Sequence, residues 1–172
     1  MSGQTVRALA GVDLHIGQGE FVAITGASGS GKSSLLNILG CLDRPSTGTY
    51  LFEGRDVATF DDEASSDLRN RRIGFVFQSF HLLPRLTVLE NVLLPLRFHR
   101  SPPADAKEHA ADLLERVGLA DRRDHRPSEL SGGQRRRASI AAALIHPCEI
   151  LILDEPTNHL DNKMTEWLEA YL

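Results

Sequence analysis

The sequence predicts an α/β domain with a mostly parallel sheet. Short apolar runs at residues 20–25, 73–77 and 150–153 have the length and composition of buried strands. Segments with helical spacing lie between these runs, and strands that alternate with helices favour a parallel sheet covered by helices. A glycine-rich turn joins the first run to a helix. We therefore expect a single domain over residues 1–172, organised around this turn.

The other elements follow from hydrophobic periodicity and from residues that begin or end helices. Val12, Leu14 and Ile16 alternate with other residues, which predicts a half-buried, antiparallel strand at residues 6–16. Thr87 is a suitable helix cap, and Gly118 is placed to stop a helix. The remaining expected elements are a turn at 43–48, a strand at 49–52, and helices beginning at 34, 61, 87, 104, 138 (ended by Pro147) and 162.

Composition narrows the class of protein. Apolar residues make up 41% and charged residues 24% of the chain, as in ordinary globular proteins. The net charge of −4 gives no reason to expect nucleic acid as a partner. No apolar run approaches the roughly 20 residues that cross a bilayer, and the N-terminus has no signal-peptide pattern. We therefore expect any membrane role to come through a partner protein.

Residues 26–33 fit the phosphate-loop pattern G-x-x-x-x-G-K-[S/T] at every fixed position. Glycines let the backbone approach phosphate oxygens closely, and the helix N-terminus adds about half a positive charge. Lys32 is placed to reach the β- and γ-phosphates, and Ser33 to hold Mg²⁺. A turn that only caps a helix and a dinucleotide fingerprint fit less well, since the latter needs a third glycine where Ser34 stands. The predicted nucleoside triphosphate site comprises Gly26, Ala27, Ser28, Gly29, Ser30, Gly31, Lys32, Ser33 and Ser34.

Two further motifs extend this site. Asp154 and Glu155 directly follow the apolar run 150–153, so a buried strand would carry one carboxylate to Mg²⁺ while the second polarises the attacking water. A second anion-binding turn at a helix start consists of Leu130, Ser131, Gly132, Gly133 and Gln134. One nucleotide does not need two such turns in one chain. We therefore expect two chains to meet head to tail, each closing its second turn over the partner's nucleotide.

In combination, these motifs resemble the nucleotide-binding domain of an ABC ATPase. The resemblance implies a P-loop NTPase fold with a mostly parallel core sheet, an N-terminal antiparallel β part and a helical subdomain at about residues 88–145 that bears the signature turn 130–134. It also implies ATP and Mg²⁺ as cofactors. The family's further strands and its switch histidine would fall beyond Leu172. We therefore expect the sheet to lack its strand between residues 20–25 and 150–153, and hydrolysis by this chain alone to be slow or absent.

The resemblance also assigns roles to single residues. Glu155 would be the general base, and Gln78 the strand-end glutamine that senses Mg²⁺ and water, with Lys32 as the third catalytic group. Ser131 and Gly133 would contact the γ-phosphate held by the opposite chain. The implied metal ligands are Ser33, Gln78 and Asp154, and the implied dimer loop contains Asn158 and Asp161.

From residue 6 to about residue 134 the chain looks most like the lipoprotein-release and macrolide-export class, and residues 74–80 and 82–87 carry that likeness. That likeness implies an ATP-binding subunit whose hydrolysis powers export or release through a membrane-spanning permease, docked around residues 80–86. The protein would be cytoplasmic, at the inner face of the plasma membrane through its partner, and would work as a head-to-tail homodimer or pseudo-dimer.

From residue 135 onward the chain looks more like the soluble ABC-F ATPases that act on ribosomes. Three arginines, Arg135 to Arg137, begin this part, and such a run at a helix start is expected to form a solvated face. The alternative functions are therefore an ABC-F-like translation factor, a non-catalytic module that binds ATP and dimerises without turnover, and a fragment or artificial chimera.

Overall fold

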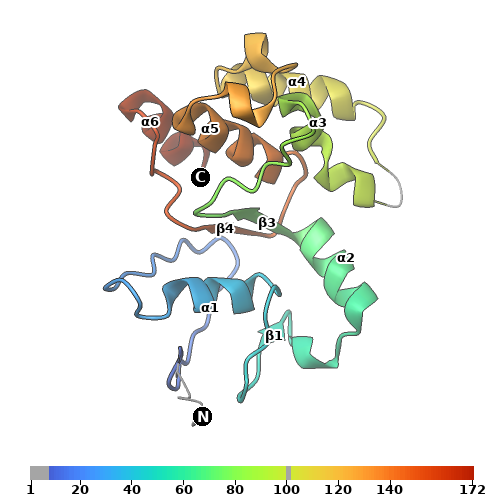
Figure 1. Ribbon diagram of the computed structural model, residues 1–172. Helices are drawn as coiled ribbons and strands as arrows, with labels where there is room; N and C mark the ends of the chain where they lie inside the picture. The colour runs from blue at the N-terminus through green and yellow to red at the C-terminus, as the bar shows by residue number, and fades with distance from the viewer. Residues whose placement is uncertain (1–7, 100–101) are drawn as a thin grey trace, which may run out of the picture. The chain divides into compact units, whose positions relative to one another are not determined.

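The computed structural model describes residues 8–99 and 102–172, in which helices are combined with two small sheets (Figure 1). The chain divides into two compact units, Met1–Phe60 and Asp61–Leu172. The helices are α1 (Lys32–Leu39), α2 (Asp62–Arg72), α3 (Val88–Leu93), α4 (Ala106–Arg116), α5 (Gly132–Ala143) and α6 (Asn162–Tyr171). The strands are β1 (Leu51–Phe52), β2 (Arg55–Asp56), β3 (Ile73–Val76) and β4 (Ile150–Leu153), and short 3₁₀ turns lie at 57–59, 95–98, 120–122 and 127–129.

The first unit holds α1 and an antiparallel hairpin. Strands β1 and β2 pair Leu51 with Asp56, and the two residues between the strands, Glu53 and Gly54, have positive φ angles of 48° and 76°. Two consecutive left-handed residues form the tight turn that matches the twist of a hairpin. The strand expected at 49–52 is therefore present as its second half.

The structure corrects two expected strands of the first unit. Neither residues 20–25 nor the described part of 6–16 is assigned to a strand. Phe21 is 76% exposed and Val12 is 51% exposed, so these apolar runs are not buried either. A strand exists only when its amides pair with a neighbour, and no strand among the described residues is hydrogen-bonded to either run.

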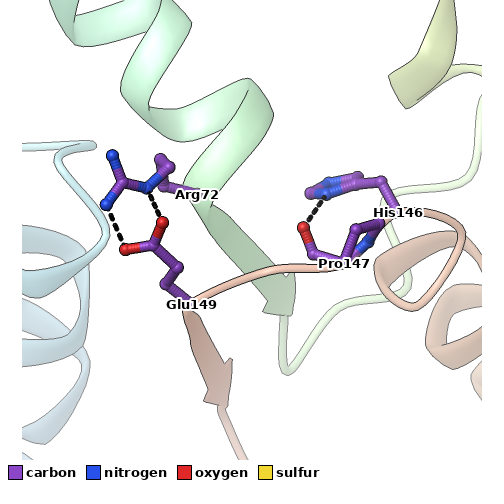
Figure 2. A network of polar contacts seen from close by, with 4 residues as sticks. All are labelled: Arg72, His146, Pro147 and Glu149. Atoms are coloured by element: carbon purple, nitrogen blue, oxygen red, sulfur yellow. Dashed lines mark hydrogen bonds and ion pairs between the residues drawn. The ribbon is translucent and has the colours of Figure 1, made fainter. Parts of the chain in front are cut away.

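The second unit contains the parallel pair that the sequence predicts. Strands β3 and β4 pair in register from Ile73 opposite Ile150 to Val76 opposite Leu153. Where the two strands begin, Arg72 and Glu149 form a double ion pair, and the Glu149 amide donates to the Arg72 carbonyl at 2.8 Å (Figure 2). These contacts join the two strands where they begin. Because the strands are parallel, their carboxyl ends also lie side by side.

Local signals explain where the helices of the second unit begin and end. Thr87 caps α3 in a capping box with Glu90, as expected for this residue. Asp61 accepts a hydrogen bond from the Ala64 amide at 2.7 Å and starts α2, whose last turn carries three arginines that suit its negative end. Gly118, with φ 67°, follows the end of α4.

The core of the second unit lies where α3, α4 and α5 pack together (Figure 1). Its central side chains are fully or almost fully buried: Val88, Val92, Leu114, Leu119, Ile140 and Ala141. No helix of the described residues is both long and apolar enough to span a membrane.

Candidate nucleotide-binding site

The phosphate loop lies in the first unit and ends in α1. Gly31 caps the helix with φ 93°, and the Leu35 amide donates to the Gly31 carbonyl at 2.9 Å. A Cβ atom on Gly31 would lie 2.2 Å from the Ala8 carbonyl oxygen, so no other residue fits there. Gly29 also has a positive φ, of 77°, so two glycines of the loop adopt the left-handed conformation that favours glycine.

Lys32 is held by the loop that it follows. Its Nζ donates to the carbonyl oxygens of Gly26 and Ala27, each at 2.8 Å. The Lys32 ammonium is therefore held against the loop that leads into the first amides of α1. Such a combination of fixed positive charge and N–H groups suits a polyphosphate.

Parallel pairing in the second unit brings together the groups that follow β3 and β4. The Asp154 amide donates to the Val76 carbonyl at 2.9 Å, which places the two strand ends side by side. One carboxylate oxygen of Glu155 accepts from Gln78 Nε2 at 3.0 Å and from Asn158 Nδ2 at 2.6 Å. Three of the predicted residues, Gln78, Glu155 and Asn158, therefore form one hydrogen-bonded group.

Glu155 reaches this position through an unusual backbone conformation. Its φ is 49°, a left-handed value that costs energy for a residue with a Cβ and that clusters at functional sites. The Asn158 amide donates to the Glu155 carbonyl at 3.2 Å and closes a turn. In this conformation the Glu155 carboxylate accepts from two neutral amide donors.

The signature turn begins α5. Ser131 caps the helix in a capping box: its Oγ accepts from the Gln134 amide at 3.3 Å, while the Gln134 side chain accepts from the Ser131 amide at 2.9 Å. A Cβ on Gly133 would lie 2.6 Å from the His159 carbonyl oxygen, whereas the atom nearest to a Cβ on Gly132 would be His159 Nδ1, at 3.7 Å. The dimer loop therefore packs directly against the signature turn.

Asp161 has a structural role in this chain. Its carboxylate accepts from the Met164 amide at 2.8 Å and caps α6, while its carbonyl accepts from Thr165 Oγ1 at 3.1 Å. The cap fixes where the loop that follows Glu155 ends. Its predicted contact across a dimer stays a prediction.

Arg136 corrects the expectation of a solvated arginine face. Its side chain is 0% exposed, and burial lowers the pKa of its guanidinium while Asp154 and Glu155 raise it. It donates to three carbonyl oxygens: Phe77 through Nη1, Gln78 through Nη2 at 2.9 Å and Asn158 through Nε at 3.3 Å. The sequence carries no signal for this burial, because the carbonyl groups come from segments far from Arg136 in the chain.

The residues present fit ATP and Mg²⁺ by their chemistry. The loop at 26–33 offers a backbone cradle that a Cβ on Gly31 would fill, together with the Lys32 ammonium. Carboxylate and amide oxygens are the ligands that Mg²⁺ prefers, and Asp154 and Gln78 supply one of each at adjacent strand ends.

Comparison with known proteins shows which family this chain is similar to. The family described as "ABC transporter" matches residues 9–158. An uncharacterized ABC transporter ATP-binding protein of Thermotoga maritima is 53% identical over 161 residues, which cover 94% of this chain and 69% of that protein. The macrolide export ATP-binding/permease protein MacB 1/2 of Paracoccus denitrificans is 54% identical over 94% of this chain, which spans only 24% of that protein.

The solved structures agree as well. The dimeric structure of MJ0796, a bacterial ABC transporter cassette, superposes with a TM-score of 0.92 at 42% identity, over 99% of this chain and 75% of that one. A second dimeric structure of the same cassette, in a post-hydrolysis state with ADP and Pi, matches equally well. These matches run well past residue 134, so the likeness to transporter cassettes does not stop at the signature turn. The chain therefore belongs to the ABC transporter family.

Proposed function

We propose that this chain binds MgATP and hydrolyses it in a head-to-tail dimer that drives export or lipoprotein release through a membrane-spanning permease. The observation that carries the proposal is the hydrogen-bonded group of Gln78, Glu155 and Asn158. A carboxylate can serve as a general base when it is within reach of the reacting proton, and the two amides hold this one in a fixed place. The phosphate loop supplies the complementary part, a cradle for the triphosphate with the Lys32 ammonium beside it.

In this proposal the residues of the chain divide the work. Lys32 and the amides of 26–33 bind the phosphates, while Ser33, Gln78 and Asp154 hold Mg²⁺, which offsets phosphate charge. Glu155 takes a proton from the attacking water, which general-base catalysis accelerates by about 10²–10⁴-fold. Ser131 and Gly133 contact the γ-phosphate bound by the partner, so that only ATP joins the two chains.

The proposed permease contact is the loop at 80–86. The side chain of Asn91, which is 4% exposed, forms hydrogen bonds with the backbone of this loop. Its Oδ1 accepts from the Leu83 amide at 2.7 Å, and its Nδ2 donates to the Leu86 carbonyl at 3.2 Å. The Leu83 side chain on this braced loop is 45% exposed. An ordered loop that presents a large apolar side chain is suited to bind a partner, since little conformational entropy is lost.

The names of the relatives favour this function over an ABC-F-like factor. MacB proteins from several bacteria, for example from Azoarcus sp. at 54% identity over 93% of this chain, are described as macrolide export proteins. Substrate and direction of transport come to this chain only as part of the proposal.

Sedimentation of the chain with MgATP, MgADP and no nucleotide tests the proposal. We expect a dimer with MgATP only, because Ser131 and Gly133 have differential contacts with the γ-phosphate alone. The Glu155→Gln variant should hold the dimer longer, since its ATP persists. Identical sedimentation in all three conditions, for wild type and variant, would contradict the proposal.

A further inference from the structure

Arg136 is a charged side chain at the centre of the second unit. It lies on α5, the helix that Ser131 caps, and it is 0% exposed. An unpaired buried guanidinium would destabilise the fold by several kcal/mol, so its donors must be satisfied. An apolar side chain of similar length would fill the same space without this cost. The positions of the groups that Arg136 binds explain why a charged side chain is buried here.

The three carbonyl oxygens that Arg136 binds belong to two separate segments. Phe77 and Gln78 follow β3, and Asn158 closes the turn after β4. The Gln78 and Asn158 side chains are the two donors to the Glu155 carboxylate. Arg136 therefore binds the backbone carbonyl groups of Gln78 and Asn158, the same two residues whose side chains donate to Glu155.

A guanidinium suits this task better than other donors. It is planar, and its donors form a rigid fork that points in several directions at once. Here Nη1 and Nη2 reach one segment while Nε reaches the other. The guanidinium carbon lies over the Phe80 ring, 5.4 Å from its centroid, and the centroids of the Phe80 and His159 rings are 5.8 Å apart. The side chain is thereby locked between the two segments.

We infer that Arg136 is a positioning residue: it fixes the segments of Gln78 and Asn158 around Glu155 and ties this group to the signature helix α5. The inference rests on the proposed function in one respect, the role of Glu155 in hydrolysis. The three hydrogen bonds of Arg136 go to backbone carbonyl oxygens and not to the Glu155 carboxylate itself. Because α5 begins with the signature turn, a shift of that helix moves Arg136 and, with it, both donors to the carboxylate.

The test compares Arg136→Met with Arg137→Met in the full chain. Methionine keeps the unbranched stem of the side chain as far as the position of Nε and removes every donor. Arg137 is a matched control on the same helix, because it makes one hydrogen bond, to the Val117 carbonyl at 3.0 Å beside the end of α4. Hydrogen exchange followed by mass spectrometry should show Arg136→Met accelerating exchange at 77–80 and 155–159 together. Arg137→Met should affect only the region of 117–119.

Kinetics separate positioning from a general loss of stability. Arg136→Met should lower kcat by about tenfold or more, as misplacement near the chemistry does, while KM for ATP changes by less than about threefold. Arg136→Lys keeps the charge and can reach only one segment, so it should release one segment and recover part of the turnover. If Arg136→Met does not fold, the Arg136→Lys variant still tests the inference.

Two results would overturn the inference. One is unchanged exchange at 77–80 and 155–159 in both Arg136 variants. The other is a fall in kcat that Arg137→Met reproduces at equal loss of stability. Identical sedimentation of the wild-type chain with MgATP, MgADP and no nucleotide would refute the proposed function instead, and the exchange result would still decide the role of Arg136.

Discussion

The side-chain amide of Gln78 donates a hydrogen bond of 3.0 Å to the carboxylate of Glu155, although the two residues are 77 positions apart in the chain. The parallel pairing of β3 with β4 makes this contact possible, since it aligns Val76 with Leu153 and leaves both side chains at the same strand ends. Asn158 completes the arrangement from the turn that follows. The carboxylate is thus oriented by amides that carry no charge.

Replacing Glu155 by glutamine tests its proposed role as the general base. We expect turnover to fall by about 10²–10⁴-fold, since an amide cannot accept the proton. The affinity for ATP should change little, because the phosphate loop is untouched. Glu166→Gln, at an exposed position of α6, is the matched control and should keep full turnover. Turnover that survives in Glu155→Gln would assign the base elsewhere.

Lys32→Ala tests the phosphate loop. Charge-assisted hydrogen bonds contribute roughly 1.5–3 kcal/mol, so ATP binding measured by calorimetry should weaken by about tenfold or more. The matched control is Lys107→Ala, which removes an exposed lysine of α4 and should leave the affinity unchanged. Equal affinity of Lys32→Ala and wild type would rule out this loop as the nucleotide site.

Features with local causes could be predicted from the sequence. The caps formed by Thr87 and Ser131 follow from the side chain at the start of each helix and its partner three residues on, and both are present. Strands at 73–77 and 150–153 could be predicted because a short run of apolar residues is typical of a buried strand. The candidate site depends mainly on such local motifs.

Features that depend on distant partners could not be predicted. The apolar run at 20–25 has strand composition, but composition cannot say whether a neighbouring strand pairs with it, and none of the described ones does. Arg136 has the composition of a surface residue, and only the carbonyl groups of segments far along the chain explain its burial. The hydrogen bond from Asn158 to Glu155 joins residues only three apart, but the motif does not predict the left-handed φ of 49° at Glu155.

Alanine at Gly133 tests the contact between the signature turn and the dimer loop. A Cβ would lie 2.6 Å from the His159 carbonyl oxygen, a backbone atom that cannot move without shifting the loop. We expect the free energy of unfolding in urea to fall by about 1–3 kcal/mol, as for overpacked sites. Gly132→Ala is the matched control, with its nearest neighbour at 3.7 Å, and should be neutral or stabilising by up to about 1 kcal/mol. Equal effects of the two substitutions would show that the loop does not press on Gly133.

The pH dependence of stability should depend on His146. This side chain is 7% exposed, and burial is the main cause that lowers its pKa below the ordinary 6.5; the nearby His99 ring lowers it further, while the hydrogen bond to the Pro147 carbonyl (Figure 2) raises it. The unfolded chain therefore binds a proton at this residue more readily than the folded chain. Stability rises with pH wherever the unfolded state binds more protons, so the contribution of neutral His146 is complete above pH 6.5 and is lost as the pH falls below it. Urea unfolding between about pH 8 and pH 5, the range in which histidine titrates, should show the difference in the free energy of unfolding between wild type and His146→Gln narrowing toward acid. A gap for His146→Gln that does not change with pH would mean that this ring titrates alike in the folded and unfolded chain.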